Sequence, residues 1–251
     1  GENYPTAVSK AVMDLTGKNV KAPNDLLGVS YIKAILKNNY TIKPICIKRT
    51  SDYHSTELKN ISSATAIRKA LYNKNDITNS VPSFVLPYLE NLHFRDNYFN
   101  LLKYKIITDN NLSIYQTVDE GIDKKLKKVI RNCNTYDDII NKVKSKRYTY
   151  NKISRMLLHI LVSFTKDMAK EIKDIEYIRI LGFNNNGRKY LNSIKKKIDI
   201  KILSKFERNF SKMLDFELKT TEIYSLCESN PLYLIEEEYK NHLGGNKSDK
   251  N

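Results

Sequence analysis

The stretch Ile61-Ser62-Ser63-Ala64-Thr65-Ala66-Ile67-Arg68 places two hydroxyl side chains before an apolar helical run, with an arginine one turn later. In the first turn of a helix, backbone N–H groups, hydroxyls and a guanidinium can converge on one anion. The stretch therefore predicts a helix that is capped by Ser62 or Ser63, ends near Leu71 and offers a phosphate-binding corner. These residues leave an alternative open, in which Ser62 only caps the helix and Arg68 is a solvated side chain.

The residues before this stretch predict two helices, a strand and a loop. Apolar spacing predicts helices over 5–15 and from Asn24 onward, with Asn24 as a cap and with these side chains facing inward: Leu27, Tyr31, Ile32, Ile35 and Leu36. A strand is predicted over 42–48. Because ligands bind at the carboxyl ends of strands in open α/β sheets, Arg49 is predicted to face a ligand. Its planar fork could bind phosphate or cover an adenine.

The rest of the chain is predicted to be mainly helical. Helices are predicted over 82–92, 96–107 and 121–132. Thr135 with Asp138 resembles a capping box, and it opens a helix that runs to about residue 146.

Thr149 is predicted to cap the helix with the clearest 3.6-residue repeat. Its apolar positions are Ile153, Met156, Leu157, Ile160, Leu161 and Phe164. A strand, a helix and a second strand are predicted over 177–181, 187–197 and 199–203, and together they would form a small βαβ unit.

Basic residues are concentrated in the second half of the chain. Residues 119–208 hold 23 lysines and arginines against 11 acidic residues, a surplus of 12 within a net charge of +15. A basic surface attracts polyanions through Coulomb steering and counterion release. The alternative is a sequence that carries lysine on every solvated face, but the uneven placement favours a nucleic acid as partner.

Composition excludes several classes of protein. With 251 residues, of which 41% are hydrophobic, the chain can form one large domain or two small ones with a core. No apolar run approaches the roughly 18 residues of a membrane span, and no basic, apolar leader is present, so we expect a cytoplasmic protein without a membrane partner. Cys46, Cys133 and Cys227 have neither zinc spacing nor an even count, which predicts reduced thiols without a disulfide partner.

Several stretches, taken in order, resemble the tRNA(Met) cytidine acetate ligase family, TmcAL, which is related to the HIGH-type nucleotidyltransferases. They are residues 23–34, 45–54, the serine stretch, 145–161, 178–188 and, more weakly, 215–226. Their order and spacing together carry the resemblance, which runs from about Tyr4 to Leu226.

The chain departs from this family in one respect. No His-x-Gly-His motif occurs, and the four histidines are isolated: His54, His93, His159 and His242. The opening at Gly1 resembles the middle of such a protein. We therefore expect a chain that lacks the HxGH segment and is inactive on its own, with a degenerate homologue as the alternative. No catalytic residue is assigned.

The resemblance implies an α+β, mainly helical fold. Residues 1–80 would be the C-terminal remnant of a Rossmann-like α/β nucleotidyltransferase domain. Residues 81–243 would form a mostly helical, basic tRNA-binding domain that contains the βαβ unit. Residues 244–251 are expected to be a disordered tail.

The resemblance also implies an ATP-dependent tRNA modification. Acetate would be activated as acetyl-adenylate, and the N4 amine of the wobble cytidine of elongator tRNA(Met) would then be acetylated. ATP and acetate are the implied substrates, with Mg²⁺ that could arrive bound to ATP; no metal ligand is assigned. The candidate ATP-binding residues are Asn24, Arg49, Ser62, Ser63, Thr65 and Arg68.

The implied tRNA surface lies in the basic half. Lysine and arginine around a helix start can hold backbone phosphates without reading sequence. The candidate tRNA-binding residues are Lys146, Arg147, Lys152, Arg155, Arg188 and Lys189. Tyr148 and Tyr150 are the candidates for stacking on unpaired bases.

Two other functions remain open at this stage. One is an adenylyltransferase of the same superfamily that acts on a small molecule and does not need the basic half. The other is a non-catalytic RNA-binding module whose nucleotide pocket is vestigial.

Overall fold

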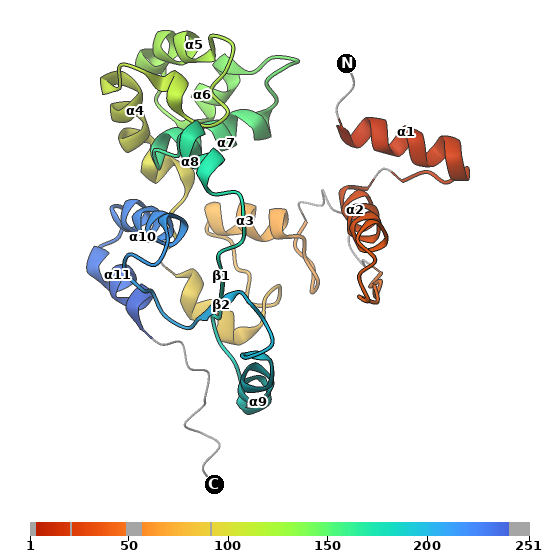
Figure 1. Ribbon diagram of the computed structural model, residues 1–251. Helices are drawn as coiled ribbons and strands as arrows, with labels where there is room; N and C mark the ends of the chain where they lie inside the picture. The colour runs from red at the N-terminus through yellow and green to blue at the C-terminus, as the bar shows by residue number, and fades with distance from the viewer. Residues whose placement is uncertain (1–3, 21, 49–56, 91, 241–251) are drawn as a thin grey trace. The chain divides into compact units, whose positions relative to one another are not determined.

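The computed structural model describes residues 4–20, 22–48, 57–90 and 92–240, and the chain divides into two units, 1–92 and 93–251 (Figure 1). The described residues are mainly helical, with one small parallel sheet of two strands. This confirms the predicted fold class. The domain boundary expected after residue 80 stays a prediction, and the expected disordered tail over 244–251 lies outside the described residues.

Unit 1 contains three helices and one 3₁₀ helix in its described residues. These are α1 (Tyr4–Thr16), α2 (Pro23–Lys37), α3 (Ala64–Tyr72) and η1 (Ser83–Leu89). The helix predicted over 5–15 is confirmed, and it is followed by Gly17 with a φ of 67°. The cap predicted at Asn24 is wrong because Ala22 is the N-cap and Asn24 lies in the first turn of α2. Proline is favoured at the first helical position, where its missing N–H costs nothing.

The strand predicted over 42–48 is wrong. Residues 41–48 form neither strand nor helix, and the side chains of Ile45 and Ile47 are 84% and 89% exposed. The inward face predicted for α2 is also wrong for four of its five positions, and Ile35 is partly buried. The exposed side chains are Leu27, Tyr31, Ile32 and Leu36. A strand needs a neighbouring strand, and the described residues of unit 1 contain none. Helix α2 contacts α1, but this contact leaves most of the apolar side chains of α2 exposed.

The helix predicted over 82–92 is shorter than expected and has 3₁₀ geometry. It spans Ser83–Leu89 and contains Pro87, which has no backbone N–H to donate. A 3₁₀ turn tolerates this residue better than a longer α-helix would, so the segment forms only a short connection.

Unit 2 begins with a cluster of short helices around one core. They are η2 (Arg95–Tyr98), α4 (Phe99–Thr108), η3 (Leu112–Ile114), α5 (Ile122–Val129), η4 (Ile130–Asn132), α6 (Tyr136–Val143), α7 (Tyr150–Leu161) and α8 (Lys166–Glu171). The apolar stripe predicted for the helix after Thr149 is confirmed, since Ile153, Met156, Leu157 and Ile160 are fully buried in this core. No described helix is both long enough and apolar enough to cross a membrane.

A threonine stands at the N-cap of two of these helices. Thr135 accepts a hydrogen bond from the N–H of Asp138, and the Asp138 carboxylate accepts from the N–H of Thr135 at 3.0 Å, which confirms the capping box. Thr149 is the N-cap of α7 as predicted, although its side chain makes no capping hydrogen bond.

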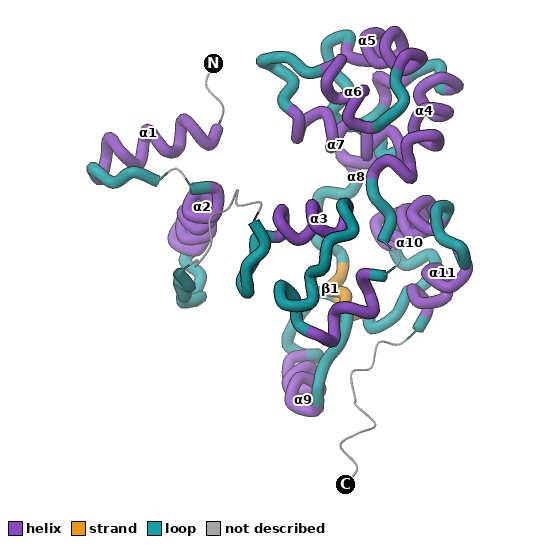
Figure 2. The backbone as a smooth tube through the Cα atoms, turned by 180° about the vertical axis from the view of Figure 1, so that it is seen from behind, coloured by secondary structure: helices purple, strands orange, loops and turns teal. Residues whose placement is uncertain are grey.

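The second half of unit 2 contains the predicted βαβ unit. Strands β1 (Tyr177–Arg179) and β2 (Lys201–Leu203) pair in parallel and are joined through α9 (Asn185–Ile194). Helices α10 (Lys212–Ser225) and α11 (Pro231–Tyr239) follow. Tyr177, Leu203, Phe206 and Leu214 form a second core. Figure 2 shows the sheet as a short orange segment among purple helices.

Candidate functional site

The serine stretch builds the N-terminus of α3. Ser63 is the N-cap: its hydroxyl accepts a hydrogen bond from the N–H of Ala66 at 3.0 Å, and its side chain is buried. This satisfies one of the N–H groups that a helix start leaves without an intrahelical acceptor. The predicted helix start is confirmed, with Ser63 as its cap.

Ser62 fixes the loop that precedes α3. Its hydroxyl accepts from the N–H of Lys59 at 2.7 Å and donates to the carbonyl of the same residue at 2.7 Å. The Ser80 hydroxyl donates to that carbonyl at 3.1 Å. Ser62 therefore closes a tight loop and ties it to residue 80, which is a structural role that the sequence did not indicate.

Thr65 and Arg68 are the exposed members of the corner. They lie three residues apart on α3, so their side chains share one face of the helix. The structure therefore brings four of the six predicted ATP residues into one helix start. Asn24 is exposed in the first turn of α2, and Arg49 lies outside the described residues.

Several lysines of unit 2 donate hydrogen bonds to main-chain carbonyls of the same unit. The Nζ atoms of Lys103, Lys125 and Lys166 each donate to a main-chain carbonyl at 2.9 Å, on Cys133, Val143 and Val118 respectively. Lys127 and Lys142 donate to the carbonyls of Asn110 and Asn132. Each of these bonds uses one of the three N–H donors of an ammonium group and holds the Nζ in place. The net charge therefore overstates the cations that are free to move towards a ligand.

The predicted basic cluster around the start of α7 also contains both side chains that have a partner and side chains that have none among the described residues. Lys146 and Arg155 are exposed and make no ion pair or hydrogen bond with another described residue. Arg147 pairs with Glu120, and the Nζ of Lys152 lies 4.2 Å from the ring centroid of Tyr148. Lys146 and Arg155 are therefore the two members best able to meet a phosphate.

The stacking role predicted for Tyr148 is wrong, because its side chain is only 6% exposed and its hydroxyl donates to the carbonyl of Asp119 at 2.9 Å. Tyr150 is partly buried: its hydroxyl donates to Asp137 at 2.8 Å and accepts from Arg95 at 2.6 Å. Burial raises the pKa of both phenols, so they are neutral hydrogen-bonding groups at neutral pH.

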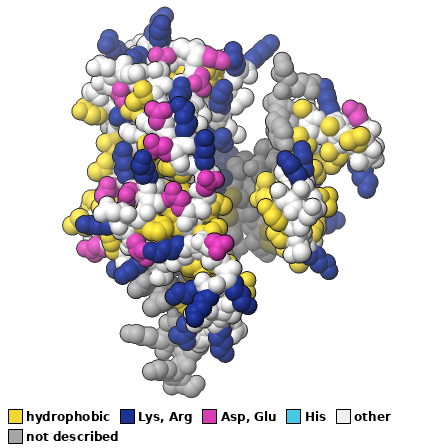
Figure 3. Space-filling model, in the orientation of Figure 1, with side chains coloured by type: hydrophobic (Ala, Val, Ile, Leu, Met, Phe, Trp, Pro, Cys, Tyr) yellow, Lys and Arg dark blue, Asp and Glu magenta, His cyan; other side chains and the backbone are white. Residues whose placement is uncertain are grey.

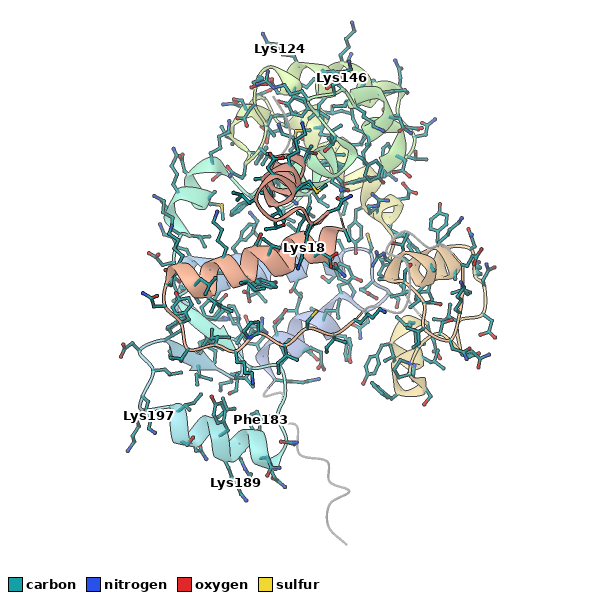
Figure 4. The ribbon with its side chains drawn as sticks, turned by 90° about the vertical axis from the view of Figure 1, so that its right-hand side faces the viewer. Lys18, Lys124, Lys146, Phe183, Lys189 and Lys197 are labelled. Atoms are coloured by element: carbon teal, nitrogen blue, oxygen red, sulfur yellow. The ribbon has the colours of Figure 1, made fainter. Side chains whose placement is uncertain are left out.

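A second basic group lies on and after α9. Arg188 and Lys189 stand in its first turns, and residues 195–197 are three further lysines. Dark-blue side chains gather over α9 in Figure 3. Figure 4 shows Lys189 on α9 and Lys197 just after it, both apart from Lys124 and Lys146. Asn184 caps the helix by accepting from the N–H of Gly187 at 2.9 Å. A Cβ on Gly187 would lie 3.0 Å from the Phe183 Cβ, which favours glycine at this turn.

Sequence reasoning missed a pocket in unit 2. It has a volume of about 470 Å³, and its lining includes Arg179 at the end of β1, Thr221 and Tyr224 on α10, and Glu238 on α11. Two stretches that carry the family resemblance, 178–188 and 215–226, meet here. Only the assignment of both stretches to one unit, which needs the tertiary structure, could have revealed the pocket.

An ion network forms the floor of this pocket. Arg179 bonds Glu217 at 3.2 Å and pairs with Glu238, and Tyr177 donates to Glu217 at 2.6 Å. Burial opposes the charge of Arg179, but the two carboxylates raise the pKa of its guanidinium above the ordinary value. Burial and the Glu217 carboxylate likewise raise the pKa of Tyr177. Arg179 therefore stays charged and Tyr177 stays neutral at neutral pH.

The sequence of this chain matches a known family of proteins. Residues 1–238 match the family model described as HIGH Nucleotidyl Transferase. The chain is 37% identical to a tRNA(Met) cytidine acetate ligase of Clostridium perfringens, over 95% of this chain and 64% of the relative. It is 33% identical to the ligase of the same name from Bacillus mycoides, over 96% of this chain and 68% of the relative.

Solved structures agree with these relatives. The apo structure of Thermotoga maritima TmcAL matches with a TM-score of 0.79 at 25% identity, over 97% of this chain and 67% of that chain. A second crystal form, bound with alpha-thio ATP, matches with a TM-score of 0.74 at 26% identity, over 96% of this chain and 64% of that chain. The chain belongs to the TmcAL family of HIGH nucleotidyltransferases, and it spans about two thirds of the length of these relatives.

Proposed function

We propose that the protein to which this chain belongs is an ATP-dependent ligase that acetylates N4 of the wobble cytidine in elongator tRNA(Met). The observation that carries this proposal is the match to tRNA(Met) cytidine acetate ligases over nearly the whole chain, at up to 37% identity. The Thermotoga maritima relative with alpha-thio ATP supports ATP as a substrate. The concentration of positive charge in residues 119–208 supports an RNA partner.

In the first step, an acetate oxygen attacks the α-phosphate of ATP, and pyrophosphate leaves. Both reactants are anions, so the site must offset the negative charge that accumulates. Thr65 and Arg68 are the exposed groups at the start of α3, and the N–H groups of its first turn add a positive helix end. Their role here is to hold the triphosphate, with Ser63 and Ser62 fixing the helix and the loop. Mg²⁺ carried by ATP would neutralise further charge.

In the second step, the cytidine N4 amine attacks the acetyl carbon of acetyl-adenylate, AMP leaves and the nitrogen loses a proton. The base must leave its stack to reach the acyl carbon. Cations on unit 2 would hold the neighbouring phosphates while this happens. All six members of the predicted set are exposed, but Arg147 pairs with Glu120 and Lys152 lies over the Tyr148 ring. The members suited to this task are therefore Lys146, Arg155, Arg188 and Lys189.

Mass spectrometry of tRNA nucleosides tests the function in cells. Deletion of the gene should remove N4-acetylcytidine from tRNA(Met), and the wild-type gene should restore it. Complementation with Arg68→Ala should restore less than Lys69→Ala, which removes a neighbouring exposed cation from the same helix. Unchanged acetylcytidine after deletion would refute the proposed reaction. Binding of tRNA by a protein whose deletion leaves acetylcytidine intact would indicate the non-catalytic RNA-binding alternative.

A further inference from the structure

The pocket between β1, α10 and α11 has the size and the mixed lining of a small-ligand site. Its volume of about 470 Å³ lies within the range of roughly 300–1,000 Å³ common for such sites. Leu181, Leu234 and Tyr224 supply apolar and aromatic surface. The Tyr224 ring stacks on Tyr98, with centroids 5.7 Å apart, which fixes its plane.

The polar groups of this pocket present acceptors. Thr220 donates its hydroxyl hydrogen to the carbonyl of Phe216 at 2.9 Å, and Thr221 donates to Glu238 at 2.6 Å. The two terminal nitrogens of Arg179 are bonded to carboxylates. The oxygens of the threonines and of Glu238 still have unused lone pairs. A ligand here is recognised best if it offers N–H donors.

The charge of the lining argues against a phosphate in the pocket itself. Arg179 is the one cation among the described residues that line the pocket, and Glu237 and Glu238 are carboxylates. Because Arg179 is held by Glu238 and by Glu217 behind it, its charge is already offset. A di- or triphosphate would face net negative charge, whereas a neutral heterocycle with an amine would not.

Cations for a phosphate lie next to the pocket along the chain. Leu181 lines the pocket, and α9 begins four residues later at Asn185, a span of at most about 14 Å. Arg188 and Lys189 follow in the first turns of α9. A strand of RNA that crosses α9 could therefore place a base in the pocket while its phosphates meet these cations.

We propose that this pocket binds an unpaired RNA base that carries an exocyclic amine, as cytosine does. The proposal rests on the proposed function for its RNA partner. The amine donates to the oxygens of Glu238 and Thr221, the ring lies against Tyr224, and Arg179 holds the carboxylate in place. Uracil carries a carbonyl where cytosine carries the amine, and this oxygen would face the acceptors of the pocket.

Fluorescence anisotropy with labelled ten-nucleotide oligomers of cytidine and of uridine tests the proposal on the full chain. The wild-type protein should bind oligocytidine about tenfold more tightly, equivalent to about 1.4 kcal/mol. Glu238→Gln keeps an oxygen that can accept from Arg179 but replaces the other carboxylate oxygen by an NH2 donor. The affinities of this variant for oligocytidine and for oligouridine should therefore differ by less than about twofold. Thr221→Val removes one acceptor with little change in shape and should also lower the ratio.

Glu236→Gln is the matched control because Glu236 is exposed on the same helix, does not line the pocket and changes the charge equally. It should keep the wild-type ratio, and far-UV circular dichroism should show that both glutamine variants are folded. Equal binding of the two oligomers to the wild type, or an unchanged ratio in Glu238→Gln, would overturn the pocket proposal.

Two further results separate this proposal from its alternatives. If neither oligomer nor tRNA binds, RNA recognition fails as a whole, and the proposed function fails with it. If free ATP displaces oligocytidine from the wild type and loses this effect in Glu238→Gln, the pocket belongs to a free nucleotide, and the RNA-borne base is refuted.

Discussion

Some lysines and arginines of unit 2 are bonded to other groups of the protein and others are not, and this difference predicts how each affects the binding of tRNA. The double variant Lys146→Gln/Arg155→Gln removes two exposed cations that have no partner among the described residues. Each lost phosphate contact lowers the slope of log affinity against log salt by about 0.7 for single strands to 0.9 for duplexes. The slope should therefore fall by about 1.4–1.8, and affinity at 0.1 M salt should fall about 25- to 60-fold.

The matched control is Lys125→Gln/Lys142→Gln, which removes the same charge. These two lysines donate to the carbonyls of Val143 and Asn132, so they contribute to the packing of α5 and α6. The control should change the slope by less than about 0.5. It should instead destabilise the protein, by about 1 kcal/mol for the Lys125 bond.

Filter binding or anisotropy with tRNA between about 50 and 200 mM salt measures the slopes, and thermal unfolding measures the stabilities. Equal losses of affinity in the two double variants would show that binding depends only on diffuse net charge. An unchanged slope in Lys146→Gln/Arg155→Gln would show that this face does not meet the RNA, and it would remove these residues from the proposed function.

Two predictions concern stability. The N–H groups of Asn134 and Thr135 lower the pKa of Asp138 below the ordinary 3.8, so this carboxylate stabilises the fold above pH 3.8 and loses its effect as the pH falls below it. Asp138→Asn should therefore unfold at lower urea than the wild type at neutral pH, with a difference that shrinks in acid; a constant difference would contradict the capping role. Gly121 has a φ of 77° at the start of α5, so Gly121→Ala should lower the free energy of unfolding by about 1 kcal/mol. Gly28 lies inside α2 with open space around it, so Gly28→Ala should raise the free energy of unfolding by up to about 1 kcal/mol. The same sign for both variants in urea unfolding would refute this difference.

Local patterns predicted the helices well. The stripe of α7 follows from a repeat of 3.6 residues, and the Thr135–Asp138 capping box follows from a spacing of three residues. Such signals involve neighbours within one or two helical turns, so they can be read without knowing the rest of the fold. The βαβ unit was predicted for the same reason, although each strand forms over only three residues.

Non-local partners explain what the sequence predicted wrongly. The isoleucines of 42–48 have a strand-like composition, but a strand forms only when another segment supplies its hydrogen bonds. Tyr148 stands among lysines and arginines, which favoured a base-stacking role, yet it is buried against Asp119, which lies 29 residues earlier. In both cases the outcome depends on a segment far away in the sequence.

In the candidate site, too, the sequence predicted the local features and missed those that depend on distant residues. The sequence located the start of α3 and the residue types of an anion-binding corner, because a helix cap is a local feature. It could not assign Ser62 to the tight loop with Lys59, which Ser80 also contacts. Nor could it distinguish the paired Arg147 from the available Lys146.

By itself, the sequence determined the family, the mainly helical class, several helix starts and the concentration of positive charge, since all of these depend on composition or on spacing along the chain. Only the tertiary structure decided which cations are available and how Arg179, Thr221 and Glu238 meet in one pocket. The reason is physical: a hydrogen bond or an ion pair depends on distance in space, and these partners come from separate segments that folding brings together.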